Sequence, residues 1–125
     1  MPGKLVHFEI PAEDDSRATR FYGDLFGWGW NTSEMGPGFH YHMTQLTDAM
    51  GGAVYKSPDN LKGVIVYFDT EDMDASVARV RELGGQADEK MPIPGIGWFA
   101  RCTDTEGNTF SLFQSDESVP HDAGS

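Results

Sequence analysis

Two short segments of the chain are apolar, and each is followed by a helix-like pattern. Residues 6–10 (VHFEI) and 64–68 (VIVYF) are rich in β-branched and aromatic residues, which favours strands. Acidic residues then open runs in which apolar side chains recur every three or four positions. These runs predict helices that end at Gly27 and at Gly84–Gly85. Each segment is therefore expected to form a strand followed by a helix.

The same order of elements occurs twice. Residues 6–27 align with residues 64–85 without a gap, at an offset of 58 residues. Residues 39–55 align with residues 98–114 at an offset of 59, and both read as strand, turn, strand. Glycine- and proline-rich segments precede both hairpins and are expected to be loops with a short strand. The repeat predicts two modules of the type βαβββ.

The predicted organisation is a single α+β domain over residues 1–115. Its first module is expected over residues 4–56 and its second over residues 63–115. Residues 116–125 are polar and acidic, which is typical of a disordered tail.

Side chains alternate along a strand, so each strand has one face on its helix and one face turned away from it. Phe8 and Ile10 are expected to pack on the first helix, and His7 and Glu9 then lie on the opposite, concave face. The apolar stripe of the first helix consists of Ala18, Phe21, Tyr22, Leu25 and Phe26. The concave face of the second module is expected to carry Ile65, Tyr67, Asp69, Ser111 and Phe113.

Composition narrows the range of functions. The formal net charge of −11 disfavours binding to nucleic acid and to anionic membranes. No apolar run is long enough to span a bilayer, and the N-terminus lacks the pattern of a signal peptide, so a cytoplasmic location is expected. The single cysteine, Cys102, excludes an internal disulfide and is expected to be buried and inert.

Two segments of the chain resemble characteristic segments of the vicinal oxygen chelate superfamily, and they occur in the same order. This superfamily includes glyoxalase I, bleomycin-resistance proteins and extradiol dioxygenases. The two segments are VHFEIPAEDDSRATRFYGDLFGW, at the N-terminus, and IPGIGWFARCTDTEGNTFSLFQ, in the last hairpin. The resemblance covers residues 5–115. It implies that the two modules form a curved, mixed and mostly antiparallel sheet with helices on its outer face. It also implies a homodimer that acts on or binds a small molecule.

In the metal-using members of this superfamily, each module supplies one ligand from its first strand and one from its last. The resemblance places the first-strand ligands at His7 and Ile65, and the last-strand ligands at Gly52 and Ser111. Only His7 keeps a usual ligand type, whereas a divalent metal site needs about three or four donors. The resemblance therefore favours a protein without a metal cofactor, similar to the bleomycin-resistance branch.

The predicted site is an aromatic cleft with a few polar groups, which suits a small flat or cationic molecule. The predicted ligand-binding residues are His7, Glu9, Tyr67, Trp98, Phe99, Ser111 and Phe113. His7 and Glu9 are also candidates for a general acid–base pair.

Two alternatives stay open. A divalent metal held by His7, His40, His42 and Glu9 would make the chain a lyase, isomerase or dioxygenase of the same superfamily. A regulatory or structural module that does not use its pocket is the other alternative.

Overall fold

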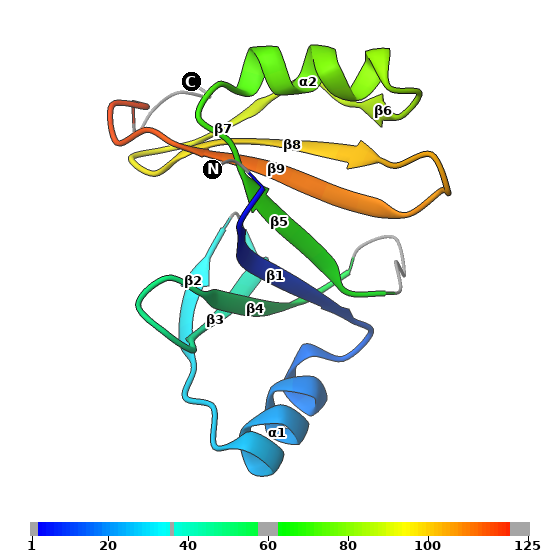
Figure 1. The fold of residues 1–125 in the computed structure, drawn as a ribbon. Helices are drawn as coiled ribbons and strands as arrows, with labels where there is room; N and C mark the ends of the chain where they lie inside the picture. Colours follow the sequence, from blue (N-terminus) through cyan, green and yellow to red (C-terminus); the bar gives the residue numbers. More distant parts are fainter. Residues whose placement is uncertain (1–2, 36, 58–62, 121–125) are drawn as a thin grey trace. The chain divides into compact units, whose positions relative to one another are not determined.

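The structure is a computed structural model, and it describes residues 3–35, 37–57 and 63–120 (Figure 1). The elements run in the order β1 (Leu5–Ala12), α1 (Asp15–Phe26), β2 (Asn31–Glu34), β3 (His40–Gln45), β4 (Gly51–Lys56), β5 (Ile65–Asp69), α2 (Met73–Glu82), β6 (Gln86–Ala87), β7 (Met91–Ile93), β8 (Gly97–Thr103) and β9 (Thr109–Ser115). The chain forms two compact units. One consists of Val6–Ile65, and the other contains the strands and the helix that follow it. We call β1–β4 with α1 the N-terminal module, and β5–β9 with α2 the C-terminal module.

Both modules have the predicted βαβββ order, and each sheet is mixed. In the N-terminal module the strands lie in the order β2-β3-β4-β1, with β1 parallel to β4 and the other pairs antiparallel. In the C-terminal module β5 is parallel to β9, and β9 is antiparallel to β8. Its next strand is split in two, because β6 and β7 both pair with β8. The prediction of an α+β fold with duplicated modules is confirmed.

The helices begin and end where the acidic residues and glycines predicted. Asp14 caps α1 by accepting a hydrogen bond from the Arg17 backbone N–H at 3.0 Å, and Asp72 caps α2 in the same way. Gly27 ends α1 in the left-handed conformation, with φ of 74°. Within the described residues, neither helix has the length and apolar character needed to cross a bilayer.

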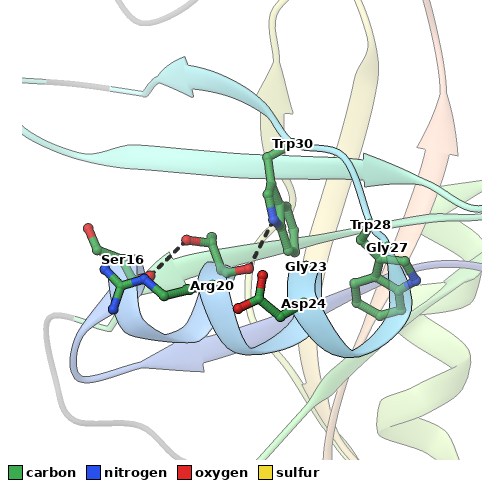
Figure 2. A pocket seen from close by; sticks show the side chains of 8 residues that line it. Ser16, Arg20, Gly23, Asp24, Gly27, Trp28 and Trp30 are labelled. Atoms are coloured by element: carbon green, nitrogen blue, oxygen red, sulfur yellow. Dashed lines mark hydrogen bonds between the residues drawn. The ribbon is translucent and has the colours of Figure 1, made fainter.

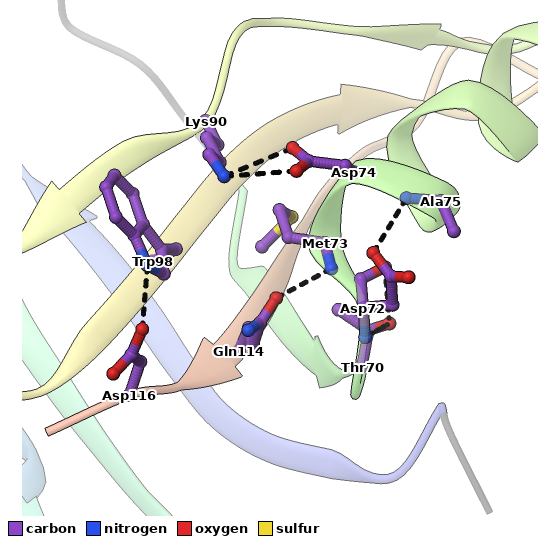
Figure 3. A network of polar contacts seen from close by, with 9 residues as sticks. All are labelled: Thr70, Asp72, Met73, Asp74, Ala75, Lys90, Trp98, Gln114 and Asp116. Atoms are coloured by element: carbon purple, nitrogen blue, oxygen red, sulfur yellow. Dashed lines mark hydrogen bonds and ion pairs between the residues drawn. The ribbon is translucent and has the colours of Figure 1, made fainter. Parts of the chain in front are cut away.

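The C-terminal module has a closed core beneath α2. Met73 and Val77 of the helix pack against Ala100, Cys102 and Leu112 of β8 and β9. The start of the helix is fixed to the sheet, because the Met73 backbone N–H donates to the side-chain oxygen of Gln114 at 2.7 Å (Figure 3).

Helix α1 differs from the prediction for its apolar stripe. Phe21, Leu25 and Phe26 are 59%, 58% and 57% exposed, and no residue of α1 is buried. The indole of Trp28 contacts Tyr22 of the helix and Phe8 of β1, with ring centroids 5.6 and 5.9 Å away. Trp28 therefore links α1 to β1, a contact that the predicted stripe did not include.

The chain also stays ordered beyond β9. Val119 is only 3% exposed, and its carbonyl accepts a hydrogen bond from the Gly95 backbone N–H at 2.8 Å. Residues 116–120 therefore differ from the disordered tail that their composition suggested, and residues 121–125 lie outside the described part of the chain.

Candidate functional site

Strand alternation places His7 and Glu9 on one face of the N-terminal sheet, as predicted. Their neighbours on β4 are Gly51 and Ala53, which have almost no side chain to cover that face. Two strands away, Tyr41 of β3 pairs with Tyr55 of β4. We call the surface that carries His7, Glu9, Tyr41 and Tyr55 the His7 face.

Three polar side chains on the His7 face form one hydrogen-bonded chain. The Nε2 atom of His7 lies 2.7 Å from the Tyr41 hydroxyl oxygen, and the Tyr41 hydroxyl donates to Glu9 Oε2 at 2.7 Å. The imidazole and phenol rings are stacked with centroids 6.1 Å apart. Glu9 is 8% exposed, so its carboxylate is held in a largely dry environment. A histidine, a phenol and a carboxylate are thus joined in one line of proton donors and acceptors.

The electrostatics of the face follow from burial. Burial lowers the pKa of His7 below its usual 6.5, because the imidazolium form would lose its hydration, and the nearby Glu9 carboxylate opposes this only in part. His7 is therefore neutral at physiological pH, and a neutral imidazole has one donor and one acceptor nitrogen.

Aromatic rings border these polar groups. The Tyr55 ring contacts Phe39 edge-on with centroids 5.9 Å apart, and it contacts Tyr41 at 6.3 Å. No local sequence pattern connects Tyr41 with His7. The two are 34 residues apart, and their contact depends on the register of β3 against β4.

The histidines of β3 do not join His7. His42 lies on the opposite face of the sheet, where its Nε2 is 2.8 Å from Asp15 of α1 and its Nδ1 is 2.8 Å from the Thr32 hydroxyl. His40 stacks against His42 with ring centroids 6.2 Å apart. The four-residue alternative of His7, His40, His42 and Glu9 is therefore not assembled as one set of ligands.

The donor set does not fit the divalent metal that the superfamily resemblance implies. Within residues 3–35, 37–57 and 63–120, no three His, Cys, Asp or Glu side chains come together as a metal-binding group. His7 Nε2 is hydrogen-bonded to Tyr41, and the other implied positions hold Ile65, Ser111 and Gly52. Gly52 moreover lies on the helix side, because it pairs with Phe8 while His7 pairs with Gly51.

The C-terminal module brings together a second polar group, on the face turned away from α2. Tyr67, Ser111 and Arg101 are neighbours across β5, β9 and β8. The Arg101 guanidinium lies 5.7 Å from the centre of the Tyr67 ring, and its Nη2 donates to the Tyr67 hydroxyl at 3.4 Å. Ser111 is fully buried, and its hydroxyl has no hydrogen-bond partner among the residues that the structure describes. Phe113 and Phe99 pair directly with each other and lie on the same face.

The position of Trp98 differs from the predicted one, because this side chain does not lie with the other predicted site residues of β8 and β9. It is adjacent to Phe99 in β8 and therefore points to the other side, where it packs against the core beneath α2. Its indole N–H donates to Asp116 Oδ2 at 3.3 Å, and the Lys90 ammonium lies 4.6 Å from the ring centre (Figure 3). Trp98 therefore belongs to the core side of β8 and does not share a face with Phe99.

A groove that the sequence did not indicate lies beside α1. Figure 2 shows it between the helix and Trp30, whose indole N–H donates to the Thr19 carbonyl at 3.1 Å. Its volume is about 520 Å³, and Ser16, Arg20 and Asp24 contribute its polar groups. A second hollow of about 620 Å³ lies on the β3 side of Trp28 and Trp30. The groove is lined by α1 and the segment that follows it, whereas the second hollow is also lined by residues 43–46 at the end of β3.

Comparison with known proteins supports the duplicated fold. The model of a glyoxalase-like domain matches residues 6–113. The chain is 31% identical over 117 residues to "Putative glyoxylase CFP32" of Mycobacterium tuberculosis, which covers 90% of this chain and 44% of that protein. It is 33% identical over 119 residues to a "Glyoxylase-like domain-containing protein" of Didymella fabae, which covers 88% of this chain and 92% of that protein. The chain thus spans less than half the length of the mycobacterial relative.

Solved structures show the same fold at lower identity. A methylmalonyl-CoA epimerase in complex with methylmalonyl-CoA and NH4+ superposes with a TM-score of 0.74 and 21% identity, over 96% of this chain and 99% of that one. The methylmalonyl-CoA epimerase of Mycobacterium tuberculosis superposes with a TM-score of 0.71 and 17% identity, over 91% and 88% of the two chains.

Proposed function

The chain belongs to the glyoxalase-like domain family of the vicinal oxygen chelate superfamily, and from that membership we propose that it binds a small organic molecule on its His7 face without a metal. The observation that carries this proposal is the hydrogen bonding of the His7 side chain. Its Nε2 is hydrogen-bonded to the Tyr41 hydroxyl, which in turn donates to Glu9, so the one usual metal-ligand type among the four implied positions belongs to a hydrogen-bonded network.

The chemistry of the face favours a flat or cationic ligand. The His7 face carries the aromatic rings of Tyr41 and Tyr55, and the electron-rich faces of such rings attract planar groups and cations. The Glu9 carboxylate lies next to these rings, and the chain has a net charge of −11. Each of these features stabilises a positive or hydrogen-bond-donating ligand more than an anion.

Thermal unfolding in the presence of a chelator tests the proposal. A set of flat cations, flat neutral compounds and matched anions is added to the purified protein. We expect the melting temperature to rise with the concentration of at least one flat cation, since saturation at 100 times Kd adds about 2.7 kcal/mol to the free energy of unfolding. Tyr41→Phe and Glu9→Gln should weaken this shift, whereas Glu13→Gln, an exposed carboxylate nearby, should leave it unchanged.

The second candidate function is a metal-dependent enzyme of the same superfamily, a lyase, isomerase or dioxygenase. It is favoured by the position of His7, which matches the first ligand of the metal-using members. Elemental analysis after separate addition of Zn, Ni, Mn and Fe distinguishes the two functions. Retention of one metal at close to one equivalent, lost in His7→Ala, would overturn metal-free binding and make the enzyme the better proposal.

Family membership also supports a homodimer. The exposed side chains of Phe21, Leu25 and Phe26 offer an apolar surface on α1 that a second subunit could cover. Light scattering coupled to size exclusion should give twice the chain mass of 13.8 kDa. A double substitution Phe21→Glu/Leu25→Glu should produce a monomer if α1 forms the interface.

A further inference from the structure

A hydroxyl, an imidazole and a carboxylate meet on the face of the N-terminal sheet opposite His7. Thr32 of β2 lies directly across from His42 of β3, and its hydroxyl oxygen is 2.8 Å from His42 Nδ1. His42 Nε2 is in turn 2.8 Å from Oδ2 of Asp15, the first residue of α1. A hydroxyl within hydrogen-bond reach of a base, with a third group orienting that base, is the usual arrangement of an activated nucleophile.

Exposure and protonation in this group also suit a nucleophile. Thr32 is exposed, whereas the side chains of His42 and Asp15 are only 16% and 22% exposed. The hydrogen bond from His42 holds the pKa of Asp15 below its usual 3.8, so Asp15 is ionised at neutral pH and can only accept. His42 Nε2 therefore donates to Asp15. In the neutral imidazole, Nδ1 then has the lone pair that accepts from the Thr32 hydroxyl.

We propose that Thr32, His42 and Asp15 form an acyl-transfer site that hydrolyses small aromatic esters, with Thr32 as the nucleophile. His42 is the general base, and Asp15 is a positioning residue that holds the imidazole in the required tautomer. The inference goes beyond the proposed function and does not depend on it, because the two sites use different residues on opposite faces of the sheet.

The groove beside α1 favours an aromatic substrate. Ser16, which follows Asp15, and Trp30, two residues before Thr32, both line this groove (Figure 2). Its volume of about 520 Å³ lies within the usual range for small-molecule sites. Trp28 and Trp30 border it with rings whose centroids are 6.0 Å apart, and such rings bind planar aromatic groups. An aromatic ester also has a phenol as its leaving group, which departs more easily than an alcohol or an amine.

The reaction needs only the ester and water. The Thr32 oxygen bonds to the carbonyl carbon, and its proton passes to His42 Nδ1. The bond from that carbon to the phenol oxygen breaks, and the phenol leaves with the proton from Nδ1. Water then bonds to the acyl carbon and gives a proton to Nδ1, which returns it to Thr32 as the acyl–oxygen bond breaks. The products are a carboxylic acid and a phenol.

Reaction of the purified protein with p-nitrophenyl acetate tests the inference. We expect steady release of nitrophenol at about pH 8 that is at least about tenfold faster with the wild type than with Thr32→Val. Peptide mass spectrometry should find the acetyl group on Thr32. Thr47 is the control within the same chain, since it is exposed but its hydroxyl accepts from the Ala49 backbone N–H. It should stay unmodified, and Thr47→Val should react like the wild type.

Conservative variants separate catalysis from packing. Thr32→Ser keeps the hydroxyl and should retain release within about threefold, whereas His42→Gln should lose about tenfold or more. Asp15→Asn should lower kcat by about tenfold or more and leave KM unchanged, an effect that a merely structural role would not produce. The melting temperature of each variant shows that it is folded under the assay conditions.

Three results would overturn the inference. They are equal release by the wild type and Thr32→Val, acetylation that does not include Thr32, and acetyl-Thr32 that forms without steady release of nitrophenol. Because the assay contains no ligand of the His7 face, each of these results would leave the proposed function untouched. A failed ligand screen would in the same way leave this inference standing.

Discussion

The Nε2 atom of His42 lies 2.8 Å from Oδ2 of Asp15, and this contact joins strand β3 to the first residue of helix α1. The two side chains are 16% and 22% exposed, so water screens the pair only partly. Because α1 has no buried residue, we expect this polar contact, together with the ring contacts of Trp28 to Tyr22 and Phe8, to hold the helix on its sheet.

A double-mutant cycle on this pair should show coupling. We expect Asp15→Ala and His42→Ala each to lower the free energy of unfolding, with a coupling of about 0.5–1.5 kcal/mol between them. Urea unfolding at neutral pH measures all four proteins. Asp24→Ala serves as the control, since Asp24 is an exposed aspartate on the same helix, and it should show no coupling to His42→Ala.

The same pair predicts a pH dependence of stability. The hydrogen bond from His42 is the main cause that holds the pKa of Asp15 below its usual 3.8. A carboxyl with a depressed folded pKa contributes stability above its unfolded pKa, and this contribution is lost as the pH falls through the folded pKa. Wild type should therefore lose more stability than Asp15→Ala as the pH falls below about 4. Parallel acid profiles for the two proteins would contradict this.

Gly52 should be intolerant of any side chain. A β-carbon added at Gly52 would overlap the Phe8 ring, whereas one added at Gly29 meets nothing within 4 Å. We expect Gly52→Ala to lower the free energy of unfolding by about 1–3 kcal/mol, as overpacking does. Gly29→Ala is the matched control with a small effect. A smaller side chain in Phe8→Leu should recover part of the loss, and additive effects in the double variant would argue against overlap.

The sequence was sufficient for the pattern of the modules, because strand alternation and helix caps are local. It placed His7 and Glu9 on one face, and Asp14 and Asp72 at the helix starts, correctly. What it missed depends on pairing between distant strands. The offset of 59 residues matched Gly52 with Ser111, although the register puts Gly52 against Phe8 on the helix side.

Two further residues show why the sequence alone could not predict the whole site. Alternation alone already separates Trp98 from Phe99, but only the packing of the core shows that Trp98 is the one beneath α2. His42 likewise could have faced His7, and its contact with Asp15 decides the direction. The link between His7 and Tyr41 left no local trace at all, since neither residue has an unusual neighbour in sequence.

Trp98 should therefore matter for stability and not for ligand binding. Trp98→Phe removes the hydrogen bond to Asp116 and weakens the contact with Lys90, so we expect a loss of about 1–2 kcal/mol in the free energy of unfolding. The Kd of any ligand found on the His7 face should stay the same within twofold. Asp116→Asn keeps an acceptor for the indole and should cost less than Trp98→Phe.

Cys102 should be unreactive in the folded protein. Its side chain is 2% exposed, and burial is the main cause that raises the pKa of its thiol to about 11. The reactive thiolate is therefore scarce at about pH 8, and a reagent has no access to it. We expect a disulfide reagent to label denatured protein fully while folded protein stays unlabelled. The control is the double variant Cys102→Ala/Glu117→Cys, which moves the single thiol to an exposed position. Its thiol should react at once and so show that the reagent is active.

The raised pKa of Cys102 also fixes the direction of a pH effect at the alkaline end. When the pKa of an acidic group is higher in the folded state than in the unfolded chain, its contribution to the free energy of unfolding is complete below the unfolded pKa. This contribution is lost as the pH rises from the unfolded pKa to the folded pKa. Wild type should thus lose stability relative to Cys102→Ala between the usual cysteine pKa of 9.0 and about 11. Urea unfolding at several pH values in this window measures the difference. A constant difference between the two proteins would show that the thiol ionises as easily in the folded state as in the unfolded chain.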